Sequence, residues 1–130
     1  KYMLDSVDGF LINGSTGDGW ELTNNDQISI INNALNSINK ANNKFKPILI
    51  GALRYTTKDV DQYIQELITE YKKIDLLNTN NDQSPFIGFV VCPPSNIEDQ
   101  NIIFQELDAL FTKYKEYPFI IYQLPQITKN

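Results

Sequence analysis

The sequence predicts an α/β fold in which parallel strands alternate with helices. Three observations carry this prediction: four short runs of apolar residues, three intervening segments of helical periodicity, and a regular spacing between the runs. The apolar runs lie at residues 9–13, 47–52, 86–92 and 118–124. They are nearly continuous rather than alternating, which is typical of parallel strands that are covered on both faces. With 130 residues, 42% of them hydrophobic, the chain has the size and apolar content of one globular domain.

The segments between the runs predict three amphipathic helices. The first is expected to begin near Thr23, which fits an N-cap because Asp26 follows three residues later. The second is expected to have Thr57 as its N-cap. The apolar faces are Ile28, Ile31, Leu35 and Ile38 in the first helix, Val60, Ile64, Leu67 and Tyr71 in the second, and Ile103, Leu107, Leu110 and Tyr114 in the third. The predicted order of elements is therefore βαβαβαβ.

The spacing of the predicted strands limits the architecture to two choices. Successive runs begin 38, 39 and 32 residues apart, and repeating βα units of this size form either a doubly wound sheet or a (β/α)8 barrel. Both edges of such a four-stranded sheet would be unpaired, which is a poor state for an isolated domain. Tyr2, Met3, Leu4 and Val7 also have the spacing of the last turn of an amphipathic helix. We therefore expect residues 1–130 to be a single domain that is truncated at both ends.

The composition excludes several classes of function. Sixteen acidic and eleven basic residues give a net charge of −5, which disfavours nucleic acids and anionic membrane surfaces as partners. The sequence contains no histidine, so histidine-based catalysis and histidine-ligated metals are excluded within it, and we predict no metal site. No stretch approaches the roughly 20 apolar residues that cross a bilayer. The single cysteine, Cys92, cannot form an internal disulfide, which favours a reducing compartment, and we expect a cytoplasmic protein.

The candidate functional residues lie where the predicted strands end, because parallel α/β proteins carry their active sites there. After the first run, the residues GSTG at positions 14–17 can fold so that consecutive N–H groups point at one carboxylate or phosphate. The same residues are also compatible with an ordinary tight turn. They lack the lysine of a P-loop and the third glycine of a dinucleotide fingerprint, which disfavours nucleotides. After the fourth run, Tyr122 is either a proton carrier or a core tyrosine.

Three other residues near the strand ends have structural interpretations. Cys92 continues an apolar run and has no histidine to activate it, so we expect a small buried hydrophobic residue. Trp20 is expected to cover the rim of the sheet rather than to line a pocket. Arg54, at the end of the second run, could meet an anion or lie in solvent, and we expect it to be solvated.

The strand-end motifs resemble those of the dihydrodipicolinate synthase and N-acetylneuraminate lyase family of class I aldolases. GSTGD at residues 14–18 is similar to the family's G-[ST]-T-G-E, and PILIG at residues 47–51 to its P-[VI]-x-x-G. FVVCP at residues 89–93 is similar to the following strand, and YQLP at residues 122–125 to Y-N-[VI]-P. The resemblance covers the whole chain. It implies a (β/α)8 TIM barrel, of which this chain would supply three helices and four consecutive strands, the second to the fifth.

The resemblance also implies a function. Members of this family bind pyruvate or a related 2-keto acid as a Schiff base with a lysine, without a cofactor. By this likeness the backbone N–H groups of Ser15 and Thr16 would hold the carboxylate, and the Ser15 hydroxyl would contact Tyr122. The phenol of Tyr122 would transfer protons while a carbon–carbon bond is cleaved or formed. The Schiff-base lysine would lie on the sixth barrel strand, beyond Asn130, so the segment alone is expected to be inactive. A homotetramer is expected by the same likeness.

Two departures from the family pattern bear on the activity. PPS at residues 93–95 replaces the frequent Pro-Tyr-Tyr, so the second tyrosine of the family's proton relay is missing. Ile127 stands where dihydrodipicolinate synthases carry an arginine, which favours the N-acetylneuraminate lyase or keto-deoxy sugar acid branch. The leading hypothesis is an aldolase or lyase that acts on a 2-keto acid. The alternatives are an inactive barrel that binds a keto acid or serves in assembly, and an anion-binding doubly wound domain.

Overall fold

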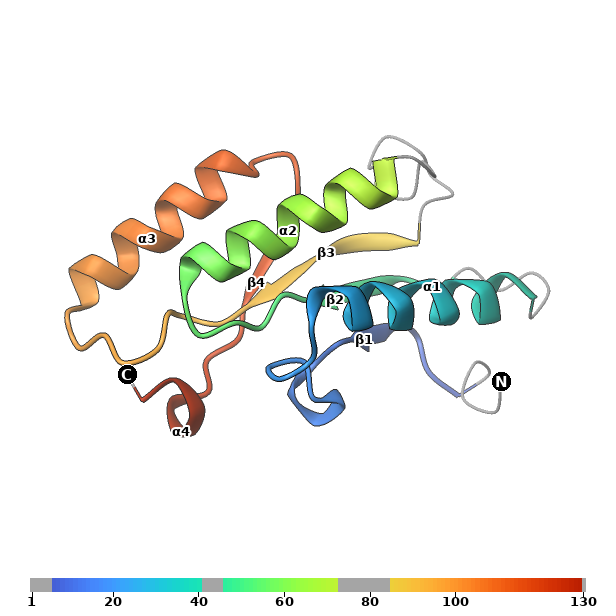
Figure 1. The fold of residues 1–130 in the computed structure, drawn as a ribbon, viewed down its shortest axis with the longest axis horizontal. Helices are drawn as coiled ribbons and strands as arrows, with labels where there is room; N and C mark the ends of the chain where they lie inside the picture. Colours follow the sequence, from blue (N-terminus) through green and yellow to red (C-terminus); the bar gives the residue numbers. More distant parts are fainter. Residues whose placement is uncertain (1–5, 41–45, 73–84, 130) are drawn as a thin grey trace.

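A computed structural model describes residues 6–40, 46–72 and 85–129 of the chain (Figure 1). Its strands are β1 (Phe10–Ile12), β2 (Ile48–Gly51), β3 (Phe86–Val91) and β4 (Phe119–Ile121). Its helices are η1 (Ser15–Gly17, a 3-10 turn), α1 (Asn24–Lys40), α2 (Thr57–Lys72), α3 (Gln100–Lys113) and α4 (Pro125–Thr128). The predicted strands and the three predicted helices are present in the expected order. Of the helical turn predicted at Tyr2, Met3, Leu4 and Val7, only Val7 lies among the described residues, and it is not helical.

The strands form one parallel sheet whose spatial order, β1-β2-β3-β4, follows the chain. Residues in register lie on the same face, as Ile12, Ile50 and Phe89 do across the first three strands. A doubly wound sheet reverses its strand order and carries helices on both faces. Here the order does not reverse and α1, α2 and α3 lie on one side of the sheet (Figure 1). The arrangement is that of consecutive βα units of a (β/α)8 barrel, and the doubly wound alternative is wrong.

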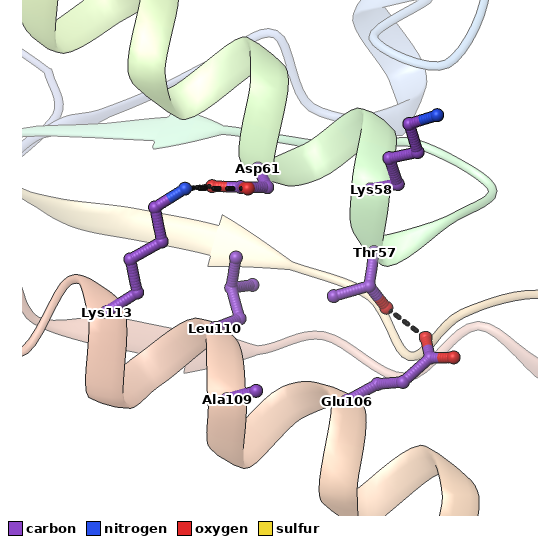
Figure 2. Close-up of a pocket in the computed structure, with 7 residues that line it drawn as sticks. All are labelled: Thr57, Lys58, Asp61, Glu106, Ala109, Leu110 and Lys113. Atoms are coloured by element: carbon purple, nitrogen blue, oxygen red, sulfur yellow. Dashed lines mark hydrogen bonds and ion pairs between the residues drawn. The ribbon is translucent and has the colours of Figure 1, made fainter.

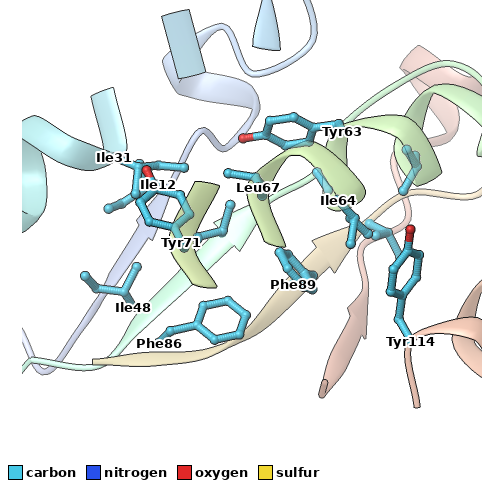
Figure 3. Packing of buried hydrophobic residues seen from close by; sticks show 14 of the residues in the cluster. Ile12, Ile31, Ile48, Tyr63, Ile64, Leu67, Tyr71, Phe86, Phe89 and Tyr114 are labelled. Carbon is cyan, nitrogen blue, oxygen red and sulfur yellow. The ribbon is translucent and has the colours of Figure 1, made fainter. Parts of the chain in front are cut away.

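The core lies between the sheet and the three long helices (Figure 3). Alternate residues of the strands face the helices, because successive side chains of a strand point to opposite faces. The cluster includes Ile12, Ile48, Ile50, Phe86, Phe89 and Val91 from the strands and Ile31, Leu35, Val60, Tyr63, Ile64, Leu67, Tyr71, Leu110 and Tyr114 from the helices and the end of α3. The apolar faces predicted from helical periodicity are therefore the faces that form the core.

The opposite face of the sheet is more open than the sequence predicts. Leu11, Ile87 and Ile120 are 45 to 48% exposed, although nearly continuous apolar runs predict strands that are covered on both faces. That prediction is wrong for these residues within the described part of the chain. In a closed barrel this face packs against side chains from the other strands. That packing explains why the face is apolar, although the four strands described here do not cover it.

The helix starts follow capping chemistry, with one correction. Thr23 caps α1 as predicted, since its hydroxyl oxygen accepts from Asp26 N at 3.2 Å and donates to the Asp26 carboxylate at 2.6 Å. The predicted cap Thr57 is instead the first residue of α2. Thr56 is the cap, because its hydroxyl makes the same two hydrogen bonds with Asp59, at 3.1 and 2.6 Å. The spacing of a capping box, with an acidic residue three positions later, fits Thr56 and not Thr57.

Helices α2 and α3 are joined by polar contacts on their outer side (Figure 2). Lys113 Nζ lies 2.6 Å from an Asp61 carboxylate oxygen, and the Tyr114 hydroxyl donates to the same carboxylate. Desolvation acts to raise the pKa of Asp61, but the hydrogen bonds from Lys113 and Tyr114 outweigh it and lower that pKa below its ordinary value. The Thr57 hydroxyl donates to Glu106 at 2.6 Å. Since these groups are partly exposed, solvent screens the contacts and their contribution to stability is small.

Candidate active site

The turn after β1 presents backbone N–H groups at the carboxyl end of the sheet. Asn13 leaves the strand with a left-handed backbone, φ 59°, and the chain then enters η1. The carbonyl oxygen of Gly14 accepts from Gly17 N at 3.0 Å and from Gly19 N at 3.1 Å, which closes the turn. The N–H groups of Ser15 and Thr16 open η1, and no backbone hydrogen bond engages them among the described residues. These are the two N–H groups that are expected, from the sequence, to hold a carboxylate.

Two side chains fix the far end of this turn. The Gly19 carbonyl oxygen accepts from Gln27 Nε2 at 2.6 Å and from Arg54 Nη1 at 2.7 Å. Arg54 also donates to the carbonyl oxygens of Leu53 and Leu22, at 2.8 and 3.1 Å. The expectation of a solvated Arg54 is therefore wrong. Its guanidinium satisfies carbonyl groups that the irregular chain after β1 and β2 leaves without partners in regular structure.

Asn13 ties the start of the turn to the helical layer. Its buried amide Nδ2 donates to the Gln27 carbonyl oxygen at 3.3 Å and to the Tyr63 hydroxyl at 3.2 Å. Burial raises the pKa of Tyr63, so this phenol stays protonated. Asn13, Gln27 and Tyr63 were not predicted to support the site, and Arg54 was expected to be solvated rather than to meet an anion. The signals available in the sequence were the strand-end position of Arg54 and of Asn13, since asparagine directly after a strand tolerates the left-handed conformation.

The structure places Tyr122 directly after β4, also at the carboxyl end of the sheet. Its N–H donates to Val91 O at 2.7 Å, which continues the β3–β4 ladder. The side chain is 37% exposed. Two residues after Ile120, it continues the strand alternation toward the face opposite the helices.

Ser15 and Tyr122 follow the two outer strands of the described sheet. Strands β2 and β3 lie between them, a separation of about 14 Å across a flat sheet at about 4.8 Å per strand. No hydrogen bond joins the two residues within the described part of the chain. The contact between the Ser15 hydroxyl and Tyr122 therefore stays a prediction, and it requires the curvature of a barrel.

A second apolar cluster covers the carboxyl end of the strands. Trp20, Leu53, Cys92 and Leu124 are buried in it, and Ile127 of α4 packs against them. Cys92 is the small buried residue that was predicted, and burial raises the pKa of its thiol to about 11. The Trp20 and Tyr55 rings pack in a tilted arrangement, with their centroids 5.0 Å apart and an interplanar angle of 36°. It covers the strand ends, as predicted for a rim residue, and it is buried there.

The loop after β3 is tied to its neighbours through its backbone. Ser95 N donates to Tyr55 O and Asn96 N donates to Thr128 O, both at 2.8 Å. The Ser95 hydroxyl oxygen is buried without a hydrogen-bond partner. This loop contains the PPS sequence at residues 93–95.

The helical layer also carries a groove. A groove of about 310 Å³ lies between α2 and α3 and is lined by Thr57, Lys58, Asp61, Glu106, Ala109, Leu110 and Lys113 (Figure 2). Its lining comes from the helical layer, and the Asp61 and Glu106 carboxylates already have partners. Among the described residues, no cluster of three or more acidic or cysteine side chains could hold a metal ion. None of the described helices has the length and apolarity needed to cross a membrane.

Solved structures with a similar fold include the following three proteins. A sialic acid aldolase from Ruminococcus gnavus superimposes with a TM-score of 0.67 at 19% identity, over 98% of this chain and 37% of its own. A dihydrodipicolinate synthase from Cyanidioschyzon merolae with lysine bound gives 0.68 at 16% identity, over 99% and 38%. A prophage protein of the dihydrodipicolinic acid synthase family from E. coli, in complex with pyruvate, gives 0.69 at 18% identity, over 98% and 39%.

These comparisons define the fold. No family model and no curated protein matches the sequence. The chain spans between 37 and 39% of the length of the three solved chains. The chain therefore has the fold of part of a (β/α)8 barrel, and it resembles the corresponding part of the dihydrodipicolinate synthase and N-acetylneuraminate lyase barrels.

Proposed function

We propose that this chain supplies the carboxylate-binding turn and the proton-transferring tyrosine of a class I aldolase or lyase that acts on a 2-keto acid. The observation that carries the proposal is the turn after β1, where the N–H groups of Ser15 and Thr16 are not engaged by the backbone. Such consecutive N–H groups bind carboxylates. One protein of similar fold was solved with pyruvate, and another is a sialic acid aldolase.

In this proposal the residues of the chain have separate roles. Ser15 and Thr16 orient the keto acid by its carboxylate, so that its carbonyl carbon faces a lysine supplied by the rest of the barrel. The lysine amine adds to that carbon, and loss of water leaves the Schiff base. Tyr122 donates a proton to the departing oxygen and later moves protons while the carbon–carbon bond breaks or forms. We infer that residues 1–130 alone do not turn over substrate, because the nucleophile lies outside them.

The environment of Ile127 supports the branch that we propose. Its side chain packs against the cluster of Trp20, Leu53, Cys92 and Leu124, which is a poor place for a group that binds a second carboxylate. We therefore favour a substrate of the N-acetylneuraminate or keto-deoxy sugar acid kind over the synthesis of dihydrodipicolinate. A homotetrameric assembly is proposed from the family resemblance, and a cytoplasmic location from the single cysteine, Cys92, which favours a reducing compartment.

The decisive experiment traps the Schiff base. The complete protein that contains these residues is incubated with pyruvate and sodium borohydride, and a reduced adduct on a lysine is sought by mass spectrometry. Tyr122→Phe should reduce turnover by about 10² or more, as expected for loss of a general acid. Tyr55→Phe is the matched control, because Tyr55 is an exposed tyrosine on a neighbouring loop. Absence of an adduct in the wild-type protein would refute the aldolase class.

A second candidate is a barrel that binds a keto acid without converting it, or that serves in assembly. The buried and unpartnered hydroxyl of Ser95 favours it, because this residue replaces a tyrosine of the family's proton relay. Calorimetric titration with pyruvate beside an aldol cleavage assay separates the candidates. Binding without turnover supports the inactive barrel, and turnover excludes it.

A further inference from the structure

Arg54 is a half-buried cation whose hydrogen bonds all go to neutral groups. Its guanidinium donates to three carbonyl oxygens, of Gly19, Leu22 and Leu53, and to Asn24 Oδ1 at 2.7 Å. It also lies over the Tyr63 ring, 4.8 Å from the centroid. Desolvation lowers the pKa of Arg54, but a guanidinium stays charged in proteins. Its positive charge is thus held next to the turn after β1.

The hydrogen bonds of Arg54 lead to the peptide that carries the Ser15 N–H group. Arg54 holds Gly19 by its carbonyl oxygen, and the N–H of Gly19 donates to the Gly14 carbonyl oxygen at 3.1 Å. That carbonyl belongs to the same peptide group as the N–H of Ser15. A peptide whose oxygen accepts hydrogen bonds is polarised and becomes a stronger donor at its nitrogen. By fixing Gly19, Arg54 therefore holds the position of the peptide that carries the Ser15 N–H, and its positive charge lies beside that peptide.

No carboxylate forms an ion pair with Arg54 among the described residues. Glu66 is linked to it only through Asn24, whose Nδ2 donates to Glu66 Oε2 at 2.7 Å while its Oδ1 accepts from Arg54. A neutral amide thus separates the cation from the nearest hydrogen-bonded anion. A carboxylate at that position would neutralise the guanidinium, and the attraction of the turn for an anion would fall.

We propose that Arg54 is a positioning residue that holds the turn at Gly14–Gly19 and gives it a preference for the carboxylate of a 2-keto acid over an uncharged analogue. This inference rests on the proposed function of the turn. It assigns a role to a side chain on the loop after β2, which does not touch the substrate.

The sharpest test moves a negative charge from residue 66 to residue 24, next to Arg54, without removing a hydrogen bond. In the double variant Asn24→Asp/Glu66→Gln, residue 24 still accepts from Arg54 and residue 66 donates back to it, so the net charge is unchanged. The dissociation constants of pyruvate and of uncharged methyl pyruvate are measured by calorimetry on the complete protein. We expect pyruvate to bind about threefold more weakly and methyl pyruvate to bind unchanged. Since every hydrogen bond is kept, a purely structural role predicts no change for either ligand.

Three single variants complete the test. Arg54→Gln removes the charge and should weaken the binding of pyruvate about tenfold relative to that of methyl pyruvate. Arg54→Lys keeps the charge but loses the planar guanidinium, and it should preserve most of the preference for pyruvate. Lys58→Gln removes an exposed charge at the start of α2 and is the control. Equal weakening of both ligands in Arg54→Gln, or no change in the double variant, overturns the inference. If wild-type protein does not bind pyruvate, the proposed function itself has failed.

Discussion

Gly51, the last residue of β2, lies where the chain after β1 crosses the neighbouring strand. A Cβ atom built at this position would be 2.3 Å from the Asn13 carbonyl oxygen and 3.3 Å from Gly14 N. Real Cβ contacts essentially never fall below 3.0 Å, so in Gly51→Ala one of the two backbones must move by about 0.7 Å. The atoms in the way are backbone atoms and cannot rotate aside. The displaced segment is the one that leads directly into the candidate anion-binding turn.

The magnitude follows from two opposing effects. Overpacking in a tight interior costs about 1–3 kcal/mol, and replacing glycine recovers about 0.4–1 kcal/mol through the unfolded chain. We therefore expect the unfolding free energy of Gly51→Ala to fall by about 1–2 kcal/mol in urea denaturation. Pyruvate affinity should also fall, because the turn is displaced.

Gly17→Ala is the matched control. No atom lies within 4 Å of a Cβ at Gly17, and the residue has no positive φ. This variant should be as stable as the wild-type protein or slightly more stable. If Gly51→Ala is as stable as Gly17→Ala, the close approach of the two backbones does not limit the fold and the argument is refuted.

Three further predictions concern capping, charge and thiol burial. Thr56→Ala should lower the unfolding free energy by about 1 kcal/mol and Thr57→Ala by less, measured by thermal denaturation; the reverse order would show that Thr57 is the cap. Asp61→Asn should lower stability by about 1 kcal/mol or less near neutral pH. Folding lowers the pKa of Asp61, so this stability difference is present above the ordinary aspartate pKa of about 3.9. It should disappear as the pH falls through the folded-state pKa. A difference in stability that persists in acid would exclude the ion pair with Lys113 as its source. The thiol of Cys92, with its pKa raised to about 11, should resist iodoacetamide at pH 8 in the native protein and react in denaturant, as followed by mass spectrometry, and rapid native labelling would contradict its burial.

Local patterns in the sequence were sufficient for the elements and their order. The apolar stripe with Ile31 and Leu35 and the capping box at Thr23 depend on residues three or four positions apart, and such spacings are read correctly without a partner segment. The cap of α2 was predicted at Thr57, one position too late, because the acidic residue of the capping box lies three residues after Thr56. The continuous apolar strands indicated a parallel sheet, although they could not show that Leu11 and Ile120 would be exposed in four strands.

The residues that shape the turn after β1 could not be identified in this way. Arg54 lies 35 residues from Gly19 in the sequence, and Tyr63 lies 50 residues from Asn13. Their hydrogen bonds exist only because parallel pairing brings the ends of β1 and β2 to one edge of the sheet.

The positions of Ser15, Thr16 and Tyr122 at the carboxyl ends of strands follow from the chain's own pattern, since an apolar run that ends in a turn places its last residues at the sheet edge wherever the sheet forms. Which side chains brace that turn, which carbonyl oxygens need a donor, and which glycine has no room for a Cβ depend on contacts between segments far apart in the chain. Hydrophobic periodicity specifies the face that a side chain occupies. Hydrogen bonds between irregular segments require the two segments to be placed to within a few tenths of an ångström, and tertiary packing sets that placement.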